Sequence, residues 1–475
     1  MKRLSNSGAM ASVLVALASA ATHSVAQVRH EDEQFLADRQ KPYDGPIYHR
    51  DEGGDPRVVF SSSNVTLMSW IPYTNFSAAF TSAATCDAYV SPSGREYALI
   101  GLSGGTGFVE VTNPGSASII TTIAGVSSLW RDVKVYQTYA YAVSEGGGGI
   151  QIIDMSRIDN GVVTLVGSVT SGGTQATHTF EINKDSGYLY RCGGGSGASA
   201  LGLRIYSLAN PASPTYLFTT ITGRYIHECQ VVNYTSGPYA GKEIAFCYSD
   251  ANSGGGTPGL SILDVTNKTS AATIVTLTAN YQYPSGSFSH QGWLSPDKHY
   301  VYLDDELDGN PATRIIDVSN LSAPVQVGTF TNGLPAIDHN LYALGNFIFE
   351  SNYRSGLRIF DATNPLAPVE RAYFDTYTTD DNSNYNGLWD NYAYLPSGIV
   401  LGSDIEKGLF VWCVGKKGDM NGDLKVDMDD VSLFTDAVLS GAAPTASCGG
   451  GDLNGDGMMD GLDIAGFAGA ILTGP

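Results

Sequence analysis

Charged residues and cysteines are scarce in this sequence. Lysine, arginine, aspartate and glutamate make up only 15% of the 475 residues, a composition that favours many short strands and tight turns over helices. Six cysteines in so long a chain do not make a disulfide scaffold. The apolar run at residues 9–21 is shorter than the about 20 residues of a membrane-spanning helix, and no later stretch qualifies, so we expect no membrane span.

The charges that are present are mostly negative. Aspartate and glutamate total 47 residues against 26 lysines and arginines, which gives a net charge of -21 at pH 7. Such a balance repels phosphate backbones and anionic lipids, so it argues against nucleic acid and anionic membranes as partners. Cations, neutral sugars and basic protein surfaces are the partners that this charge favours.

Sequence motifs of common catalytic and nucleotide-binding sites are missing. The His-Glu-x-x-His motif of metalloproteases does not occur. The glycine-rich stretches at 104–107, 147–149, 193–195 and 254–256 are turn-rich loops, and none opens a helix after a strand as a phosphate cradle requires. The sequence therefore favours a binding or display protein over an enzyme.

The N-terminus has the three parts of a secretory signal peptide. Positive residues at 2–3 are followed by an alanine-rich apolar run at 9–21, and Ser-Val-Ala at 24–26 fits a small-x-small cleavage site. We therefore expect removal of residues 1–26, a mature chain beginning at Gln27, and a secreted or cell-surface location.

Glycine and tyrosine are abundant, and one sequence pattern recurs through the chain. A strand pattern of alternating apolar residues, often Gly-Leu-x-Ile-x-Asp and in one copy beginning with Thr313, appears in seven places, at residues 107–111, 149–154, 202–207, 259–264, 313–317, 356–361 and 408–412. Strand-like segments flank each copy, with turn residues such as Asn-Pro or Ser-Asn between them. Four strands in a period of about 50 residues are typical of propeller blades. The pattern predicts an all-β fold, a seven-bladed β-propeller.

The two ends of the repeat region predict how the ring closes. The seventh unit stops after its third strand, near Trp412, and a lone strand at residues 65–70 precedes the first unit. The lone strand resembles residues 163–168, the fourth strand of the second unit. We expect it to complete the seventh blade, because closure removes the exposed sheet edges.

These observations divide the chain into four segments, which are a signal peptide at 1–26, an N-terminal extension at 27–58, the propeller at 59–414 and a small α-helical calcium-loop module at 415–475. Cys229 and Cys247 fall on two strands of one expected hairpin, and form either a disulfide or two buried thiols. Cys413 and Cys448 flank the last segment and are a second candidate pair.

A histidine or an aspartate stands before the inner strand of every predicted blade. The seven residues are Asp87, Asp132, His178, His227, His290, His339 and Asp390. Because inner strands start beside the axis of a propeller, we expect these side chains to converge at one mouth of the channel. Several second strands end on the same face with acidic residues, which are Glu145, Asp250, Asp304, Asp305, Glu306, Glu350 and Asp404. The residues next to the ring positions include Arg131, Glu228, Gln291 and Asp338.

Two interpretations of this ring remain open. Imidazoles and carboxylates that face a common axis suit zinc, iron or manganese, with the four histidines as sufficient direct ligands. Alternatively, the ring caps strand ends and hydrogen-bonds to neighbouring groups and water. Aromatic residues form a sugar platform or pack between blades, and the candidates are Trp130, Trp293, Tyr353, Tyr377 and Trp389.

Two stretches near the C-terminus have the spacing of a twelve-residue calcium loop. The ligand positions hold Asp419, Asn421, Asp423, Lys425, Asp427 and Asp430, and then Asp452, Asn454, Asp456, Met458, Asp460 and Asp463, with Lys425 and Met458 contributing backbone carbonyls. Each loop runs into a short apolar helix, and two copies in one register argue against a merely solvated acidic loop. We expect two Ca²⁺ ions, and weaker binding in the first loop, where Leu424 replaces the glycine that eases the turn.

The two loop–helix units resemble a type I dockerin over residues 418–475. The resemblance implies docking on a cohesin-like module or another surface protein. The recognition positions of that family correspond to Met428, Asp429, Gly461 and Leu462.

The propeller segment is similar to the choice-of-anchor B family, which is built from LVIVD-type repeats. The matching segments are residues 130–136, 289–294, 303–307, 337–341 and 403–409. The resemblance implies a secreted or surface-bound bacterial protein that carries a C-terminal anchoring module, and it implies no settled reaction.

Three functions follow from these features. The favoured hypothesis is a propeller that binds a protein or glycan through its acidic, histidine-lined face while the tail docks it in place. The alternative is a metal-dependent hydrolase or lyase that acts on extracellular polysaccharide through the same ring. A purely structural surface protein is the third.

Overall fold

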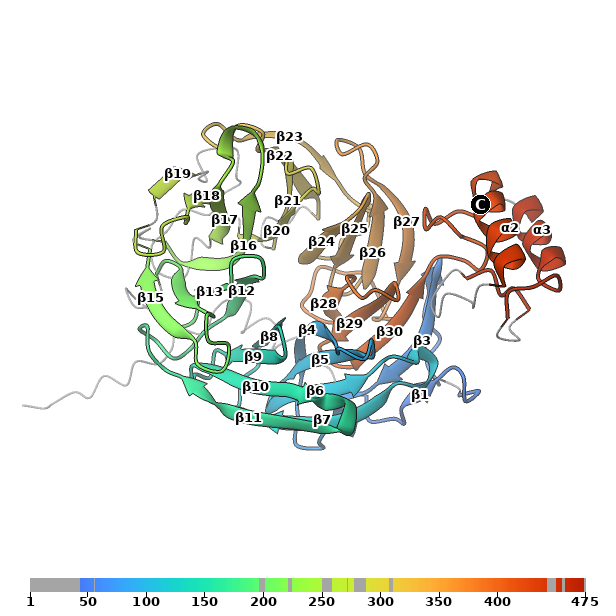
Figure 1. Cartoon of the computed structure of the whole chain (residues 1–475), viewed down its shortest axis with the longest axis horizontal. Coiled ribbons are helices and arrows are strands. Elements are labelled where there is room, and N and C mark those ends of the chain that lie inside the picture. The colour runs from blue at the N-terminus through green and yellow to red at the C-terminus, as the bar shows by residue number, and fades with distance from the viewer. Residues whose placement is uncertain are drawn as a thin grey trace, which may run out of the picture.

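The computed structural model describes residues 43–54, 56–195, 201–220, 224–249, 259–270, 272–276, 288–306, 311–441, 450–454 and 458–473. The expected signal peptide, Cys448 and Asp456 lie outside the described residues. Seven antiparallel sheets stand around a central axis, as Figure 1 shows. The predicted seven-bladed β-propeller is therefore confirmed.

The first three blades follow one another along the chain, each with four consecutive strands. Their strands are β4 (Ala83–Val90), β5 (Glu96–Leu102), β6 (Gly105–Glu110) and β7 (Ser118–Ala124), then β8 (Arg131–Tyr136), β9 (Tyr139–Ser144), β10 (Ile150–Arg157) and β11 (Val162–Val169), then β12 (Thr179–Asn183), β13 (Tyr188–Cys192), β14 (Arg204–Ser207) and β15 (Thr215–Thr219).

Blades four to six repeat the same order. Their strands are β16 (Ile226–Tyr234), β17 (Lys242–Ser249), β18 (Gly259–Asp264) and β19 (Ala272–Thr276), then β20 (Ser289–Leu294), β21 (Tyr300–Asp305), β22 (Thr313–Asp317) and β23 (Val325–Phe330), then β24 (Asn340–Leu344), β25 (Phe347–Ser351), β26 (Leu357–Asp361) and β27 (Val369–Phe374).

The seventh blade is completed by the N-terminal part of the chain. Its strands β28 (Leu388–Tyr392), β29 (Ile399–Asp404) and β30 (Gly408–Val414) are joined by β3 (Val65–Ile71), which pairs antiparallel with β30. Trp70 on β3 is fully buried, stacks on Phe410 at 5.4 Å and donates its indole N–H to the carbonyl of Lys407. The predicted closure is confirmed.

Two short strands extend this contact between the chain ends. β1 (Tyr48–His49) adds to the free edge of β3, and β2 (Ser62–Ser63) pairs with β27 of the sixth blade. The N-terminal segment therefore covers the edges of two adjacent blades, where unpaired backbone groups would otherwise be exposed.

Burial decreases from the inner part of a blade to its rim. Every residue of β5 is buried, whereas exposed and half-buried residues alternate along most of β23. The inner part of a blade faces neighbouring blades on both sides, so both faces of its strands are buried, while rim strands show the period of two of a half-exposed strand.

The aspartate that ends the recurring pattern has a local structural role. Its carboxylate accepts the backbone N–H two residues further on, which forms a tight turn. The N–H donors and their acceptors are Ser156 and Asp154, Thr266 and Asp264, Ser319 and Asp317, and Thr363 and Asp361. The turn follows the third strand in blades four, five and six, whereas in the second blade it lies inside β10, which continues to Arg157.

Four cysteines are buried free thiols, namely Cys86, Cys192, Cys229 and Cys247. Cys229 and Cys247 stand opposite each other in the β16–β17 ladder without a bond between them. Of the two alternatives, the disulfide is wrong and the buried thiols are confirmed. Cys413 is disulfide-bonded, and its predicted partner lies outside the described residues.

Two helices follow the propeller and lie outside the ring, beside β27 and β3 in Figure 1. They are α2 (Val431–Ser440) and α3 (Ile464–Thr473), and the ring of Phe434 on the first stacks on that of Phe467 on the second at 3.9 Å. No helix of the described residues is long and apolar enough to cross a membrane.

Candidate functional site

Four histidines form a continuous row at the centre of the ring. His178, His227, His290 and His339 come from blades three to six, each at the start of an inner strand, and all four are buried. The distances between successive ring centroids are 4.0, 4.5 and 4.1 Å. We call the place that these residues occupy in a blade the axial position.

Hydrogen bonds orient the imidazoles of this row. Nδ1 of His290 lies 3.2 Å from the carbonyl oxygen of His339, and Nδ1 of His339 lies 2.9 Å from that of Trp389. A carbonyl only accepts, so Nδ1 carries the proton and Nε2 keeps the lone pair in both rings. Nδ1 of His178 contacts the carboxylate of Glu145 at 2.6 Å. Burial lowers the pKa of His339 well below its ordinary value.

Two carboxylates approach the row and divide it into two groups. In the first, ligand atoms of His178, His227, Glu228 and His290 all lie within 4.8 Å of one another. In the second, Oε2 of Glu306 lies 3.8 Å from Nε2 of His290, and its Oε1 lies 3.8 Å from Nε2 of His339. His290 belongs to both groups.

β-Bulges help to place these groups. The pairing of β16 shifts between Ile226 and Glu228, and that of β20 shifts between Ser289 and Gln291. His227 and His290 are the extra residues, and a bulge redirects side chains that would otherwise alternate between the faces of the sheet. This explains how the adjacent His227 and Glu228 both join one group.

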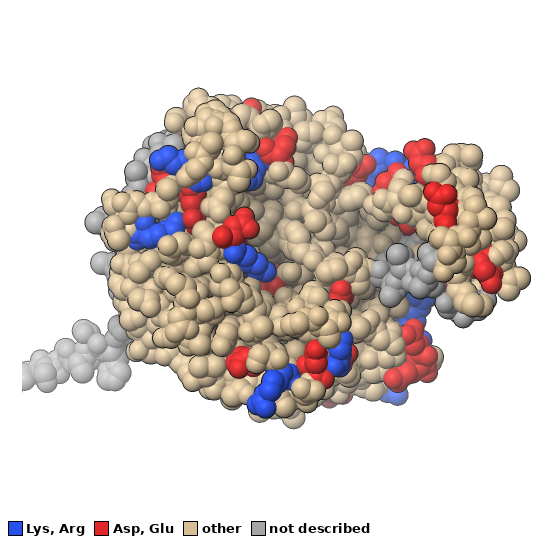
Figure 2. Space-filling model, viewed as in Figure 1, with Lys and Arg blue, Asp and Glu red and all other residues tan. Residues whose placement is uncertain are grey.

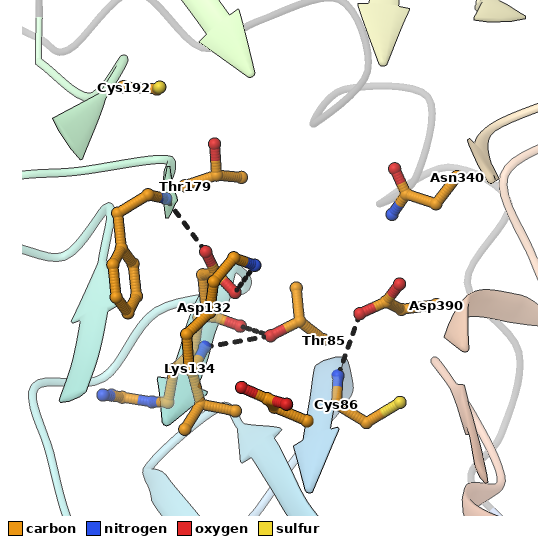
Figure 3. A network of polar contacts seen from close by, with 12 residues as sticks. Thr85, Cys86, Asp132, Lys134, Thr179, Cys192, Asn340 and Asp390 are labelled. Atoms are coloured by element: carbon orange, nitrogen blue, oxygen red, sulfur yellow. Dashed lines mark hydrogen bonds and ion pairs between the residues drawn. The ribbon is translucent and has the colours of Figure 1, made fainter. Parts of the chain in front are cut away.

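Hydrogen bonds between blades fix the register of the ring. In each bond, the acceptor is the side chain of the residue that follows the axial position. The donor is a backbone N–H of the next blade, from the residue two positions after the axial position of that blade. The pairs are Gln291 with Leu341, Asp390 with Cys86, Thr85 with Val133, and Asp132 with Phe180. Asp132 and Asp390 appear in this role in Figure 3.

This register corrects one expectation from the sequence. The four histidines occupy the axial position, but Asp132 and Asp390 lie one residue beyond it and Asp87 lies three beyond it. The axial positions of the remaining blades hold Ala84, Arg131 and Trp389. The structure therefore brings the histidines together and places the aspartates at other levels of the channel.

A second ring lines a cavity in the channel. The residues three beyond the axial position all border a cavity of about 340 Å³, and they are Asp87, Lys134, Glu181, Gln230, Trp293, Tyr342 and Tyr392. We call this set the inner ring. Charged side chains come from blades one to three and aromatic ones from blades five to seven, with Tyr394 beside them. Charges are otherwise sparse on the face seen in Figure 2.

The charged part of the cavity is held in a low-dielectric environment. Burial raises the pKa of Glu181 and of Asp390 to about 7. Burial also disfavours the charge of Lys134, but Asp132 and Glu181 outweigh it and raise the pKa of the ammonium group. Lys134 donates a hydrogen bond to Asp132 at 3.2 Å. The cavity therefore holds a cation among several carboxyl groups.

The aromatic candidates from the sequence separate into different environments. Trp293 borders the cavity and meets Tyr342 edge-on, with ring centroids 5.0 Å apart. Trp130 and Trp389 stack on each other beside His339, and Tyr353 donates a hydrogen bond to Glu306. Sequence reasoning missed Lys134, Glu181, Tyr342, Tyr392 and Tyr394. The first four lie three residues beyond the axial position, and this constant spacing is the signal that would have found them.

The two acidic loops share one hydrogen-bond pattern. Both carboxylate oxygens of the last aspartate accept backbone N–H groups of its own loop. The donors are Met420, Asn421 and Asp427 for Asp430, and Leu453, Asn454 and Asp460 for Asp463. Asp419 accepts N–H groups from Gly422, Asp423 and Leu424 in the same manner.

Leu424 has the strained backbone that its position predicts. Its φ is 65°, in the left-handed region that glycine enters most readily, and its side chain packs against the outer part of the propeller. Burial raises the pKa of Asp419 to about 6. In loop two, Asp456 lies outside the described residues.

Fold and axial geometry together define a seven-bladed β-propeller with a polar, ligand-sized channel. The chain carries LVIVD repeats, since the family model described as LVIVD repeat matches residues 130–170 and 308–332. These segments fall in the second and fifth blades. No curated protein matches the chain.

Solved structures similar to this chain have low sequence identity to it. A protein from Lactobacillus plantarum is 14% identical with a TM-score of 0.46, over 63% of this chain and 84% of that one. The C-terminal WD40 domain of Sif2 is 12% identical with a TM-score of 0.42, over 70% and 81%. The computationally designed Ika8 protein is 9% identical with a TM-score of 0.42, over 66% and 80%.

Proposed function

We propose that this chain is a glycan-binding propeller that acts outside the cell and takes a sugar unit into its channel cavity. The inner ring is the observation that supports this proposal. Half-buried Trp293, Tyr342 and Tyr392 offer aromatic faces to the apolar face of a sugar ring, while Glu181 and Lys134 offer hydrogen bonds to its hydroxyls. A cavity of about 340 Å³ suits one or two sugar units better than a protein segment.

Binding of glycans to the full chain tests this proposal. A glycan array on the mature protein identifies the ligand, and calorimetry then compares wild type with Trp293→Ala. We expect at least a tenfold loss of affinity, because the substitution removes one wall of the cavity. Tyr239→Ala is the control, since Tyr239 lies half-buried on an outer loop of blade four.

The other outcomes contradict the proposal. Equal affinity of wild type and Trp293→Ala places the glycan elsewhere. A chain that binds no glycan on the array and instead captures a purified basic protein through the acidic face is a protein-binding propeller, which is the other form of this hypothesis.

The C-terminal loops are the proposed attachment device. Their carboxylates repel one another when empty, and twelve-residue loops of this spacing take Ca²⁺ through six or more oxygens. Met428 and Leu462 at the expected recognition positions are 70% and 69% exposed, which leaves them available to a cohesin-like or other surface protein. Two calcium ions per chain are expected, with loss of one in Asp430→Asn and of the other in Asp463→Asn.

We propose the extracellular location from the signal-peptide pattern of the N-terminal segment, and it is tested there. Expression of the full chain with its first residues should give a secreted protein whose N-terminal sequencing starts at Gln27. An intact N-terminus on protein retained inside the cell would contradict this part of the proposal. A cell-surface location under the choice-of-anchor B resemblance requires, in addition, calcium-dependent retention on the producing cells.

The second candidate function is a metal-dependent polysaccharide hydrolase or lyase, and the histidine row favours it. It predicts turnover of the bound glycan that a chelator abolishes. Binding without turnover, in the presence and absence of added zinc, iron or manganese, supports the first proposal alone.

A further inference from the structure

We propose that His178, His227, His290 and Glu228 form a binding site for one divalent transition-metal ion. Three imidazole nitrogens and one carboxylate oxygen from three consecutive blades lie within 4.8 Å of one another. A metal with bonds of about 2.1 Å needs ligand atoms closer than this, so side-chain rotation closes the group around the ion. The site does not depend on a glycan in the cavity.

The orientation of the imidazoles matches what a metal requires. Nδ1 of His290 donates to a backbone carbonyl, and Nδ1 of His178 is held by Glu145, so Nε2 is the ligand atom in both rings. Metal-bound histidines usually donate their other N–H to a carboxylate or a carbonyl in this way. Nδ1 of His178, His290 and His339 each contacts an oxygen acceptor, which fixes the orientation of these three rings.

The charge of the group also fits a divalent ion. Glu228 supplies one negative charge directly and Glu145 a second one through His178. Nitrogen-rich sites with one carboxylate suit zinc, iron, manganese and copper rather than Ca²⁺, which prefers oxygen. The site therefore differs in ligand chemistry from the acidic loops of the tail.

An entry path to the site runs through the channel. Glu228 is half-buried and borders the cavity together with Thr179, the neighbour of His178. A hydrated ion in the cavity would meet the carboxylate of Glu228 first and the buried imidazoles next. Oε2 of Glu306 lies 3.8 Å from Nε2 of His290, so this carboxylate stands beside the ligand atom of that ring.

Zinc and cobalt titrations of the mature full-length chain test the proposal. The protein is stripped with a chelator and then kept in excess Ca²⁺, so that the acidic loops are occupied. We expect one Zn²⁺ or Co²⁺ per chain, with visible Co²⁺ absorption bands that indicate nitrogen ligands. Asp430→Asn and Asp463→Asn in the tail should leave this stoichiometry unchanged.

Substitutions at the site provide the decisive comparison. Glu228→Gln keeps the volume of the side chain and should lower zinc affinity at least 100-fold. Glu145→Gln, which acts through His178, should lower it roughly 10- to 100-fold. The controls are Glu370→Gln, a half-buried glutamate on β27, and His299→Gln, an exposed histidine, and both should bind zinc as wild type does.

Three results would overturn the proposal. One is wild-type zinc affinity in folded Glu228→Gln and Glu145→Gln variants. Another is a Co²⁺ spectrum without nitrogen ligands, and the last is a stoichiometry that falls only in the tail variants. His227→Gln adds the loss of a direct ligand, and circular dichroism shows whether it folds; the two glutamate variants decide the question if it does not.

Discussion

Two arcs of the propeller axis make different use of the same backbone framework. In blades three to six the axial positions carry histidines, whereas in blades seven, one and two the polar function moves to aspartates one or three residues further on. Asp390, Asp87 and Asp132 belong to what we call the aspartate arc, and the four histidines form the histidine arc.

The contacts of the aspartate arc satisfy the backbone of the next blade. Asp132 accepts from Phe180 N–H and from Lys134, and Asp390 accepts from Cys86 N–H and from the hydroxyl of Tyr342. Asp87 accepts two backbone N–H groups. Each carboxylate therefore uses both oxygens within the fold, as the interpretation of the ring as strand-end capping requires.

An imidazole has a different distribution of polar atoms. One ring nitrogen of His290 or His339 satisfies a carbonyl of the next blade, and the other lies 3.8 Å from the carboxylate of Glu306. The comparison teaches that position in the repeat does not separate a structural residue from a candidate ligand. What separates them is whether the second polar atom of the side chain contacts the backbone and side chains of the fold or lies among other ligand atoms.

The largest expected effect is on stability and comes from the aspartate arc. Asp132→Ala leaves the N–H of Phe180 buried without its acceptor and removes the partner of Lys134, so we expect a loss of about 3 kcal/mol in the free energy of unfolding. Chemical denaturation of wild type and variant, in metal-free buffer, measures it. Asp381→Ala, at a half-buried residue outside the channel, is the control and should change little. An Asp132→Ala variant as stable as wild type would contradict the structural role of the aspartate arc.

Addition of zinc should stabilise the folded chain through the histidine arc and not through the aspartate arc. Zinc at about 100 times its dissociation constant raises the free energy of unfolding by about 2.7 kcal/mol if it binds only the folded chain. Wild type and Asp132→Asn should both gain this amount, because Asp132 lies outside the histidine group. His290→Gln should gain almost nothing. An equal gain in all three chains would place the ion outside the histidine arc.

Acid stability provides a third test. The pKa of Asp390 is raised to about 7 by burial, so between its ordinary value and pH 7 the folded chain binds more protons than the unfolded chain. Stability therefore falls as pH rises through this interval, by at most about 1.4 kcal/mol per pH unit for one group. Asp390→Asn should show a smaller fall between about pH 4 and 7 in thermal unfolding. A slope identical to that of wild type would contradict the assignment.

The sequence predicts the propeller well because each blade repeats the same local chemistry. The aspartate of the recurring pattern forms the same turn in at least four blades, and β3 closes the ring as its likeness to a fourth strand predicts. Such features depend on neighbours in the chain, which the sequence displays directly.

The axial site could be predicted only in part. Histidines at the axial positions were found, but bulges at His227 and His290 and the shift of Asp87, Asp132 and Asp390 depend on pairing registers. A shift of one residue moves a side chain to the other face, and spacing alone does not reveal it. The inner ring remained unnoticed because its chemistry differs from blade to blade.

Calcium binding by the tail stays a prediction. The backbone and packing of its first loop nevertheless show what the sequence could and could not reveal. Leu424 adopts the left-handed turn at a cost of about 1 kcal/mol, and its side chain is packed against the propeller. The sequence identifies the unusual residue, while its packing with another domain depends on contacts that only the structure shows.

The smallest expected difference comes from two threonines one residue beyond the axial position. Thr85 in the first blade accepts from Val133 N–H and donates to the Arg131 carbonyl, whereas Thr179 in the histidine arc donates to the carbonyl of His227. Both side chains are 7% exposed, so valine removes the hydroxyl in equal environments. Thr85→Val should cost about 1.5 kcal/mol and Thr179→Val about 0.5 to 1 kcal/mol, since one loses two hydrogen bonds and the other loses one.

Their effects on metal affinity should have the reverse order. Thr179 holds the backbone of His227, so Thr179→Val should weaken zinc binding several-fold, and Thr85→Val should leave it unchanged. Parallel denaturation and zinc titration of the two variants measure both effects in one matched pair. If the free energy of unfolding and the zinc affinity fall together in both variants, the two arcs are not functionally separate. That result would contradict the distinction between structural and ligand-binding polar groups at this axis.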